Sequence, residues 1–233
     1  MPARGHTETM ETVEYAPGRL ADLFGESTRP TALVWHGMQS DARAAVRPLA
    51  ELLARHGMRA IVPDWNSHAV DGGRQDLLAS ACFALDRNTN PDGLVLVGWS
   101  MGGLAAAGLT LQADRLRVPL VHTVCLAGAF AARDPISGGH LDEGLPAEAV
   151  GAPFTLLHGV SDDVIPVTVS RTFAARLEQV GWPVEVVELD TDHGAIAGAQ
   201  YDPAANRYSA AEDPQTQCVA SHVAGRIAAI IGC

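Results

Sequence analysis

The stretch that decides the fold runs from Gly93 to Ala107 and reads GLVLVGWSMGGLAAA. It begins with a short apolar run typical of a buried β-strand and ends in Ala and Leu, which favour a helix. Between them Gly98, Ser100 and Gly102 form the pattern G-x-S-x-G. A sharp strand-to-helix turn exposes the serine hydroxyl near the positive end of the helix. We therefore predict that Ser100 is a nucleophile; the alternative is a plain glycine-rich turn.

Outward from this stretch, short apolar runs alternate with longer helix-like segments, a pattern typical of a mostly parallel sheet with helices on both faces. The expected strands are Ala32–His36, Ala60–Pro63, Gly93–Gly98, Leu120–Ala127, Phe154–His158 and Val184–Leu189. The expected helices are Ala42–His56, Gln75–Asp86, Gly102–Gln112, Thr168–Gln179 and Gln215–Ile231. Residues 12–24 are expected to form an edge hairpin.

The 233 residues suit a single α/β domain, and we expect the first 11 of them to be flexible. Residues 128–153, between two expected strands, are rich in Gly and Pro and too few for a large cap domain. A second stretch, residues 197–213, is expected to be irregular. Ligands of such sheets bind beyond the carboxyl ends of the strands, so the loops that follow the strands are where a site is expected.

Composition and charge exclude several classes of function. Hydrophobic residues make up 47% of the chain and charged residues 18%, which suits a compact globular protein. The formal net charge of −11 disfavours nucleic acid as a partner, because an acidic surface repels phosphate. No apolar stretch is long enough to span a membrane, and the N-terminus lacks the apolar core of a signal peptide. We therefore expect no membrane association and a cytoplasmic location.

No motif of the sequence indicates a cofactor. The four cysteines, Cys82, Cys125, Cys218 and Cys233, show no CxxC spacing, so we expect neither a disulfide framework nor a metal site. Cys82 and Cys125 lie in apolar runs and are expected to be buried. HExxH, the Walker A loop and G-x-G-x-x-G are all missing, so no metal, nucleotide or redox cofactor is predicted.

A serine hydroxyl needs a nearby base to take its proton, and imidazole suits that task near neutral pH. His193 follows the last expected strand and is the predicted base; the alternative is a solvated loop histidine. The other eight histidines lack this position. Two of them, His36 and His158, each precede a glycine at a strand end and are expected to serve the turns.

Four segments, taken in order, resemble the landmarks of the α/β-hydrolase superfamily. They are Trp35-His36-Gly37, Gly98-Trp99-Ser100-Met101-Gly102, His158-Gly159-Val160-Ser161-Asp162 and Asp192-His193-Gly194. The resemblance extends from about Val13 to Ile230 and implies the α/β-hydrolase fold. The early segments Glu14–Gly18 and Leu20–Phe24 are similar to the opening of small carboxylesterase, dienelactone-hydrolase and formamidase-like members.

The resemblance also implies the acid that orients the base. Residues 158–166 match the superfamily's acid loop, H-G-x-x-D-x-x-[VI]-P, in which the acid is the first aspartate. Asp162 is therefore the predicted acid, and the chain order Ser100, Asp162, His193 is that of the superfamily. Asp163 is the rival, although a role in capping the next helix suits it better.

An oxyanion needs N–H donors set in place beforehand. One should be the backbone N–H of Met101, directly after the nucleophile. The resemblance implies Met38 as the second donor, with Gly37 allowing the close approach. The chain departs here from the H-G-G-G pattern of many lipases and esterases, which disfavours bulky substrates. The alternative for this loop is a simple strand-to-helix turn.

Six residues at or beside expected strand ends are candidates to line a substrate pocket, and ordinary core packing is the alternative for each. They are Trp35, Met38, Trp65, Asn66, Trp99 and Phe130.

These residues together predict a cofactor-free serine hydrolase that cleaves a small carboxylic ester through an acyl-enzyme on Ser100. His193 would be the general base and Asp162 the orienting acid. Hydrolysis of an amide or enol-lactone bond, as in formamidase-like or dienelactone-hydrolase-like proteins, is one alternative, and acyl transfer is another. A binding protein that kept the fold is the remaining alternative, disfavoured because Ser, Asp and His are all present.

Overall fold

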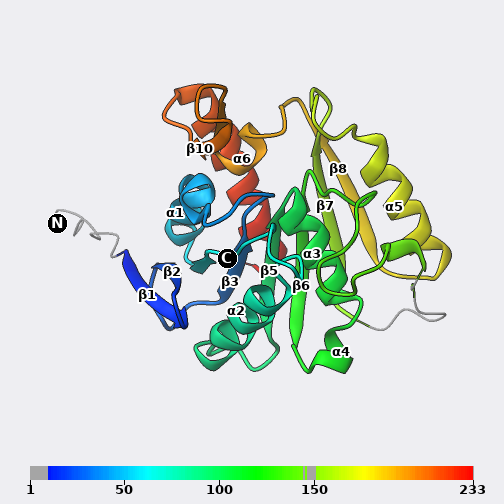
Figure 1. Ribbon diagram of the computed structural model, residues 1–233, viewed down its shortest axis with the longest axis horizontal. Helices are drawn as coiled ribbons and strands as arrows, with labels where there is room; N and C mark the ends of the chain where they lie inside the picture. Colours follow the sequence, from blue (N-terminus) through cyan, green and yellow to red (C-terminus); the bar gives the residue numbers. More distant parts are fainter. Residues whose placement is uncertain (1–9, 144, 146–150, 233) are drawn as a thin grey trace.

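The computed structural model describes residues 10–143, 145 and 151–232, and its centre is an eight-stranded sheet (Figure 1). The strands are β1 (Glu11–Ala16), β2 (Arg19–Phe24), β3 (Thr31–Trp35), β4 (Arg59–Pro63), β5 (Leu94–Trp99), β6 (Leu120–Leu126), β7 (Phe154–Gly159) and β8 (Val184–Leu189). Their order in the sheet is β1-β2-β4-β3-β5-β6-β7-β8. The pairs from β4–β3 to β7–β8 are parallel, so the expected mostly parallel sheet is confirmed.

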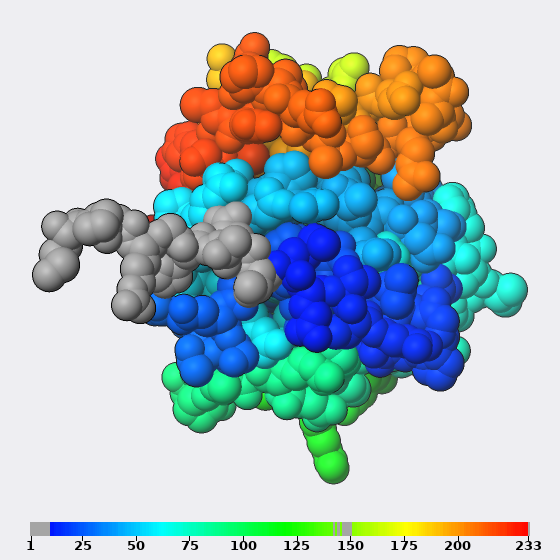
Figure 2. Space-filling model, turned by 90° about the vertical axis from the view of Figure 1, so that its left-hand side faces the viewer, coloured from blue at the N-terminus to red at the C-terminus, as the bar shows by residue number. Residues whose placement is uncertain are grey.

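The antiparallel part of the sheet is confined to one edge. There β1 and β2 form the expected hairpin, and β2 pairs antiparallel with β4. Figure 2 faces this edge, and the dark-blue residues of the hairpin lie at its surface. Residues 1–9, for which we expected flexibility, lie outside the described residues, and residue 11 already begins β1.

Successive side chains of the central strands point to opposite faces of the sheet, and this produces two hydrophobic cores, one on each face. On β3, Leu33 and Trp35 belong to one core, and Ala32 and Val34 belong to the other. The helices α2 (Arg74–Asp86), α3 (Met101–Thr110) and α5 (Thr168–Gln179) supply the first core. The second core is covered by α1 (Arg47–Arg55) and α6 (Pro214–Ile230). Both faces of the central strands are therefore buried, which explains their nearly continuous apolar sequences.

Three segments differ from the sequence expectation. The expected helix over residues 42–56 begins as a 3-10 turn, η1 (Arg43–Val46), and α1 starts just before Pro48, whose missing N–H is tolerated at a helix start. A short helix, α4 (Ala113–Leu116), follows α3. The stretch expected to be irregular contains η3 (Ala195–Ala197) and an antiparallel hairpin of β9 (Ala199–Asp202) and β10 (Arg207–Ala210).

The connection from β6 to β7 holds one regular element among its described residues, the 3-10 helix η2 (Leu141–Glu143). No large cap domain forms among these residues, in line with the sequence prediction.

Of the two cysteines expected to be buried, Cys125 is buried but Cys82 is exposed, because Cys82 lies on the outward side of α2. In the described part of the chain, no helix is both long enough and apolar enough to cross a membrane.

Candidate active site

Ser100 lies at the turn between β5 and α3, with φ of 57° and ψ of −117°. Such a conformation costs a residue with a side chain on the order of 1–3 kcal/mol. Glycines flank it because a Cβ on Gly98 would lie 2.1 Å from the Gly102 carbonyl oxygen, and one on Gly102 would lie 2.4 Å from that of His36. The Ser100 N–H donates to the Leu126 carbonyl at 2.8 Å, which ties the turn to β6. The strained strand–turn–helix geometry expected from G-x-S-x-G is present.

Asp162 and His193 meet although 31 positions of sequence separate them. Nδ1 of His193 lies 2.8 Å from Oδ2 of Asp162, whose side chain is fully buried. The other carboxylate oxygen, Oδ1, accepts hydrogen bonds from the N–H groups of Val164 and Ile165 at 2.9 and 2.8 Å. Asp163 is exposed. The structure thus brings the first aspartate of the acid loop to His193, and not its neighbour.

The surroundings of Asp162 favour its charged form. Burial raises the pKa of this carboxyl, but hydrogen bonds from His158, His193 and the Ile165 N–H outweigh burial and hold the pKa well below its usual range. An ionised carboxylate accepts from the Nδ1–H of a neutral imidazole and stabilises an imidazolium. Asp162 can therefore fix the tautomer of His193.

Trp99 joins the histidine loop to the nucleophile turn. Its indole N–H donates to the His193 carbonyl at 2.8 Å, and the two ring centroids are 5.4 Å apart. No hydrogen bond joins Ser100 Oγ to His193 Nε2 among the described residues; in structures without substrate this contact is often long and shortens when substrate binds. The sequence suggested Trp99 as a pocket residue, but it is buried in the core and supports the loop of His193.

The loop after β3 comes close to Ser100. A Cβ on Gly37 would lie 3.3 Å from the Ser100 Cβ, so glycine permits this approach. Among the described residues, no protein acceptor takes the backbone N–H of Met38 or of Met101. Both amides therefore remain free to donate to a substrate oxygen.

His36 holds this loop in place through buried hydrogen bonds. It is fully buried, its Nδ1 bonds the Gly37 carbonyl at 2.8 Å, and its Nε2 accepts from the N–H groups of Ala42 and Trp65 at 3.3 and 3.2 Å. Burial lowers its pKa to about 4, so the ring is neutral near pH 7. The expectation that His36 serves the turn agrees with these contacts.

Three of the six pocket candidates serve core packing. Trp35, Trp65 and Trp99 are buried in the cores, and the Asn66 side chain bonds Ser40. Met38 is exposed, and Phe130 lines a hollow.

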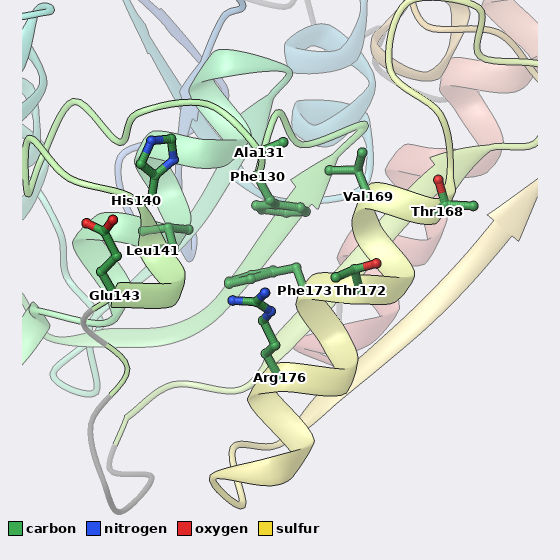
Figure 3. Close-up of a pocket in the computed structure, with 10 residues that line it drawn as sticks. All are labelled: Phe130, Ala131, His140, Leu141, Glu143, Thr168, Val169, Thr172, Phe173 and Arg176. Atoms are coloured by element: carbon green, nitrogen blue, oxygen red, sulfur yellow. The ribbon is translucent and has the colours of Figure 1, made fainter.

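That hollow has a volume of about 440 Å³ and lies between α5 and the β6–β7 connection (Figure 3). Phe130 and Phe173 face each other in it, with ring centroids 4.2 Å apart. One end of it is near Ser100, because the N–H of Ala129, next to Phe130, donates to the Ser100 carbonyl at 3.1 Å. A second hollow of about 310 Å³ borders His193, with Tyr201 and Tyr208 of the β9–β10 hairpin in its wall.

The β9–β10 hairpin contributes to the site without a local signal in the sequence: its Tyr208 ring lies 5.9 Å from that of His193, a contact that depends on how distant segments pack. His158, the first residue of the acid loop and expected to serve the turn, also contacts the acid: its Nε2 is 3.2 Å from Asp162 Oδ2. Across the described residues, no group of three or more His, Cys, Asp or Glu side chains is arranged to hold a metal ion.

Neither a family model nor a curated protein matches the sequence, but many solved structures match the fold. Two structures of esterase 2 from the planctomycete Thermogutta terrifontis, one with propionate bound and one phosphorylated by paraoxon, each have a TM-score of 0.72 and 17% identity, over 96% of this chain and 94% of theirs.

Two further proteins match at a similar level. MGS-M1, an α/β hydrolase from a Medee basin deep-sea metagenome library, has a TM-score of 0.68 and 17% identity, over 97% of this chain and 99% of its own. EstE5, soaked with p-nitrophenyl butyrate, has a TM-score of 0.70 and 15% identity, over 97% and 86%. The chain therefore has the α/β-hydrolase fold that its motifs implied.

Proposed function

Because the chain has the α/β-hydrolase fold, we propose that it hydrolyses small carboxylic esters through an acyl-enzyme on Ser100. One observation carries the proposal: His193 Nδ1 bonds the buried Asp162 carboxylate at 2.8 Å, and the loop of His193 is bonded by the indole N–H of Trp99, the residue before Ser100. A base fixed by a buried acid beside a strained serine is the arrangement that nucleophilic acyl transfer needs.

In the first half of the reaction, Ser100 Oγ bonds to the carbonyl carbon of the ester while His193 Nε2 takes its proton. Asp162 keeps the ring proton of the neutral imidazole on Nδ1, which leaves Nε2 able to accept, and it then stabilises the imidazolium. The tetrahedral intermediate breaks its bond to the alcohol oxygen, and His193 gives its proton to that oxygen.

In the second half, water takes the place of the serine hydroxyl. His193 accepts a proton from the water as its oxygen bonds to the acyl carbon, and returns the proton to Ser100 Oγ as the ester bond to the enzyme breaks. The products are a carboxylic acid and the restored serine, so protein side chains and water complete the cycle.

The N–H groups of Met101 and Met38 are the proposed donors to the negative oxygen of each tetrahedral intermediate. Met101 begins α3, so its N–H also has the favourable field of the helix N-terminus. The lack of a protein acceptor for either amide among the described residues supports this assignment.

The hollow lined by Phe130 is the proposed site of the acyl group. Its volume of about 440 Å³ is within the range of small-molecule sites. Besides the stacked rings of Phe130 and Phe173, the apolar side chains of Leu141 and Val169 and the polar side chains of His140, Glu143 and Arg176 line its wall (Figure 3). The polar groups limit its apolar part, which suits a small acyl group. The propionate in the Thermogutta terrifontis esterase and the p-nitrophenyl butyrate soaked into EstE5 are acyl groups or esters of that size.

A substrate panel tests the proposal. The purified protein is assayed with p-nitrophenyl acetate, a thioester, a lactone and an aryl amide, beside a Ser100→Ala variant whose folding is checked by thermal unfolding. We expect ester hydrolysis that disappears in the variant. Hydrolysis that survives in Ser100→Ala, or a preference for the lactone or the amide over the ester, would refute it.

A further inference from the structure

A second histidine, His158, contacts the proposed catalytic carboxylate. It stands near the end of β7 and is fully buried, and its Nε2 lies 3.2 Å from Asp162 Oδ2. The same nitrogen is 2.8 Å from the carbonyl oxygen of Ile165, and Nδ1 is 2.7 Å from the hydroxyl of Ser170 on α5. Two imidazoles, those of His158 and His193, therefore meet one oxygen of Asp162.

These contacts define where the ring hydrogen of His158 lies. Both neighbours of Nε2 are acceptor oxygens, so Nε2 must carry a hydrogen. The hydroxyl of Ser170 can donate to Nδ1, and this buried side chain lies against the ring. The hydrogen on Nε2 thus faces the Ile165 carbonyl at 2.8 Å and Asp162 Oδ2 at 3.2 Å.

The same contacts fix the carboxylate. Oδ1 of Asp162 is held by the N–H groups of Val164 and Ile165, and Oδ2 is bonded by His193 Nδ1 at 2.8 Å, with His158 Nε2 as a longer contact at 3.2 Å. Rotation of the carboxylate would break bonds at both oxygens. Because the imidazole nitrogens of His193 and His158 both face Oδ2, at 2.8 and 3.2 Å, each takes up part of the negative charge that the other would otherwise receive.

We infer that His158 is a positioning residue, which holds the Asp162 carboxylate in the orientation that His193 needs and shares its negative charge. The inference rests on the proposed function, since it acts through His193. Loss of this donor should lower kcat, because the carboxylate is less well oriented, with little change in KM. It should also move the acid limb of the kcat–pH profile to higher pH, because more negative charge then faces His193.

Other charged and titratable groups near these histidines stay the same when His158 changes. Glu188 on β8 lies opposite His158 in the sheet and is bound by Arg171 of α5. On the side of His193, Tyr208 of β10 has its pKa raised to about 12 by burial and by nearby carboxylates, among them Asp163 and Asp192. A change in the profile therefore reports on the donor at position 158.

Three variants separate the effect of losing the Nε2–H donor from the effect of losing the ring. His158→Leu removes the donor, His158→Gln keeps an N–H donor near Nε2, and His122→Leu makes the same loss at a half-buried histidine of β6 that bonds Thr155. We expect kcat to fall by roughly tenfold to a hundredfold in His158→Leu, as for a lost hydrogen bond to a charged group. His158→Gln should recover most of it, and His122→Leu should match wild type in kcat and pH profile.

Several results would overturn the inference. They are a folded His158→Leu variant with wild-type kcat and pH profile, a His158→Gln variant as impaired as His158→Leu, and an equal effect of His122→Leu. If the Leu variant fails to fold, NMR of wild-type protein containing ¹⁵N-histidine decides: the Nε2–H tautomer at His158 supports the inference and the Nδ1–H tautomer overturns it. A wild-type protein that does not react with a fluorophosphonate at Ser100 would refute the proposed function, while the NMR result still tests the position of the ring hydrogen.

Discussion

Replacing Asp162 by Asn tests the proposed triad most directly, because the four contacts of this carboxylate fix what an amide would do there. Oδ1 accepts two backbone N–H groups, and Oδ2 faces Nδ1 of His193 and Nε2 of His158. An Asn oxygen can take only one of these two places. If it stays with the backbone, the amide NH₂ faces His193 and forces Nδ1 to accept, which places the ring hydrogen on Nε2 and removes the base.

The size of the effect follows from that tautomer. By analogy with the serine-protease triad, in which loss of the correct tautomer lowers kcat by about 10⁴-fold, we expect a loss of about 5 kcal/mol of transition-state stabilisation. The amide NH₂ of the Asn would also face the Nε2–H of His158, and two donors that face each other should reduce the free energy of unfolding by ~1–3 kcal/mol. Asp163→Asn is the matched control: its side chain is exposed, and an exposed charge is worth ~0–1 kcal/mol, or at most about a fivefold change.

The assay is steady-state hydrolysis of p-nitrophenyl acetate by the two variants and the wild type at pH 7, with thermal unfolding of each. We expect Asp162→Asn to fold and to lose nearly all of its kcat, and Asp163→Asn to stay close to wild type. The reasoning is refuted if Asp163→Asn is the more damaged variant, or if a folded Asp162→Asn keeps more than about a tenth of the activity.

Three further outcomes are expected. A fluorophosphonate should label Ser100, as intact mass and peptide mapping would show, and label on a different residue would exclude it as the nucleophile. Burial lowers the pKa of His36 to about 4, so between about pH 6.5 and 4 the unfolded chain binds a proton at this residue that the folded chain does not. The free energy of unfolding, whose contribution from His36 is fully present above pH 6.5, therefore falls by on the order of 3 kcal/mol as the pH is lowered to 4. The stability difference between wild type and His36→Asn in urea unfolding should shrink accordingly from pH 7 to pH 4, and a constant difference would contradict this. Among p-nitrophenyl esters from acetate to palmitate, kcat/KM should peak below eight carbons, since each further methylene adds about 0.8 kcal/mol only where apolar surface can bury it; a longer optimum would show a deeper pocket.

The turn at Ser100 could be predicted because its signals are local. Apolar residues before Gly98 and a helix-forming run after Gly102 specify strand, turn and helix within a few positions, and the glycines occupy places where the structure leaves no room for a Cβ. The expected strands of the parallel sheet were found for a similar reason, because strands buried on both faces have continuous apolar sequences. The cytoplasmic location of the protein remains a prediction from the sequence.

The β9–β10 hairpin and the exposure of Cys82 could not be predicted in this way. The hairpin segment contains Gly198, Pro203 and Asn206, residues typical of irregular loops, and its strands span only four residues each, so no period is established. Cys82 occupies an apolar run, but α2 turns it outward. In a helix, the face that a residue occupies depends on how the helix is seated on the sheet, and a short apolar run does not specify that.

The sequence by itself determined the parallel sheet and the strained turn at Ser100, and the resemblance predicted the order of the proposed nucleophile, acid and base. Only the tertiary structure decided that His193 meets the Asp162 carboxylate, because His193 lies on the loop after β8, 31 positions away, whereas His158, Val164 and Ile165 lie within four residues of Asp162. The same holds for Trp99, which bonds a carbonyl 94 positions away. The physical reason is that backbone propensity and apolar period act over a few residues, whereas a hydrogen bond between loops depends on the packing of the whole sheet that carries them.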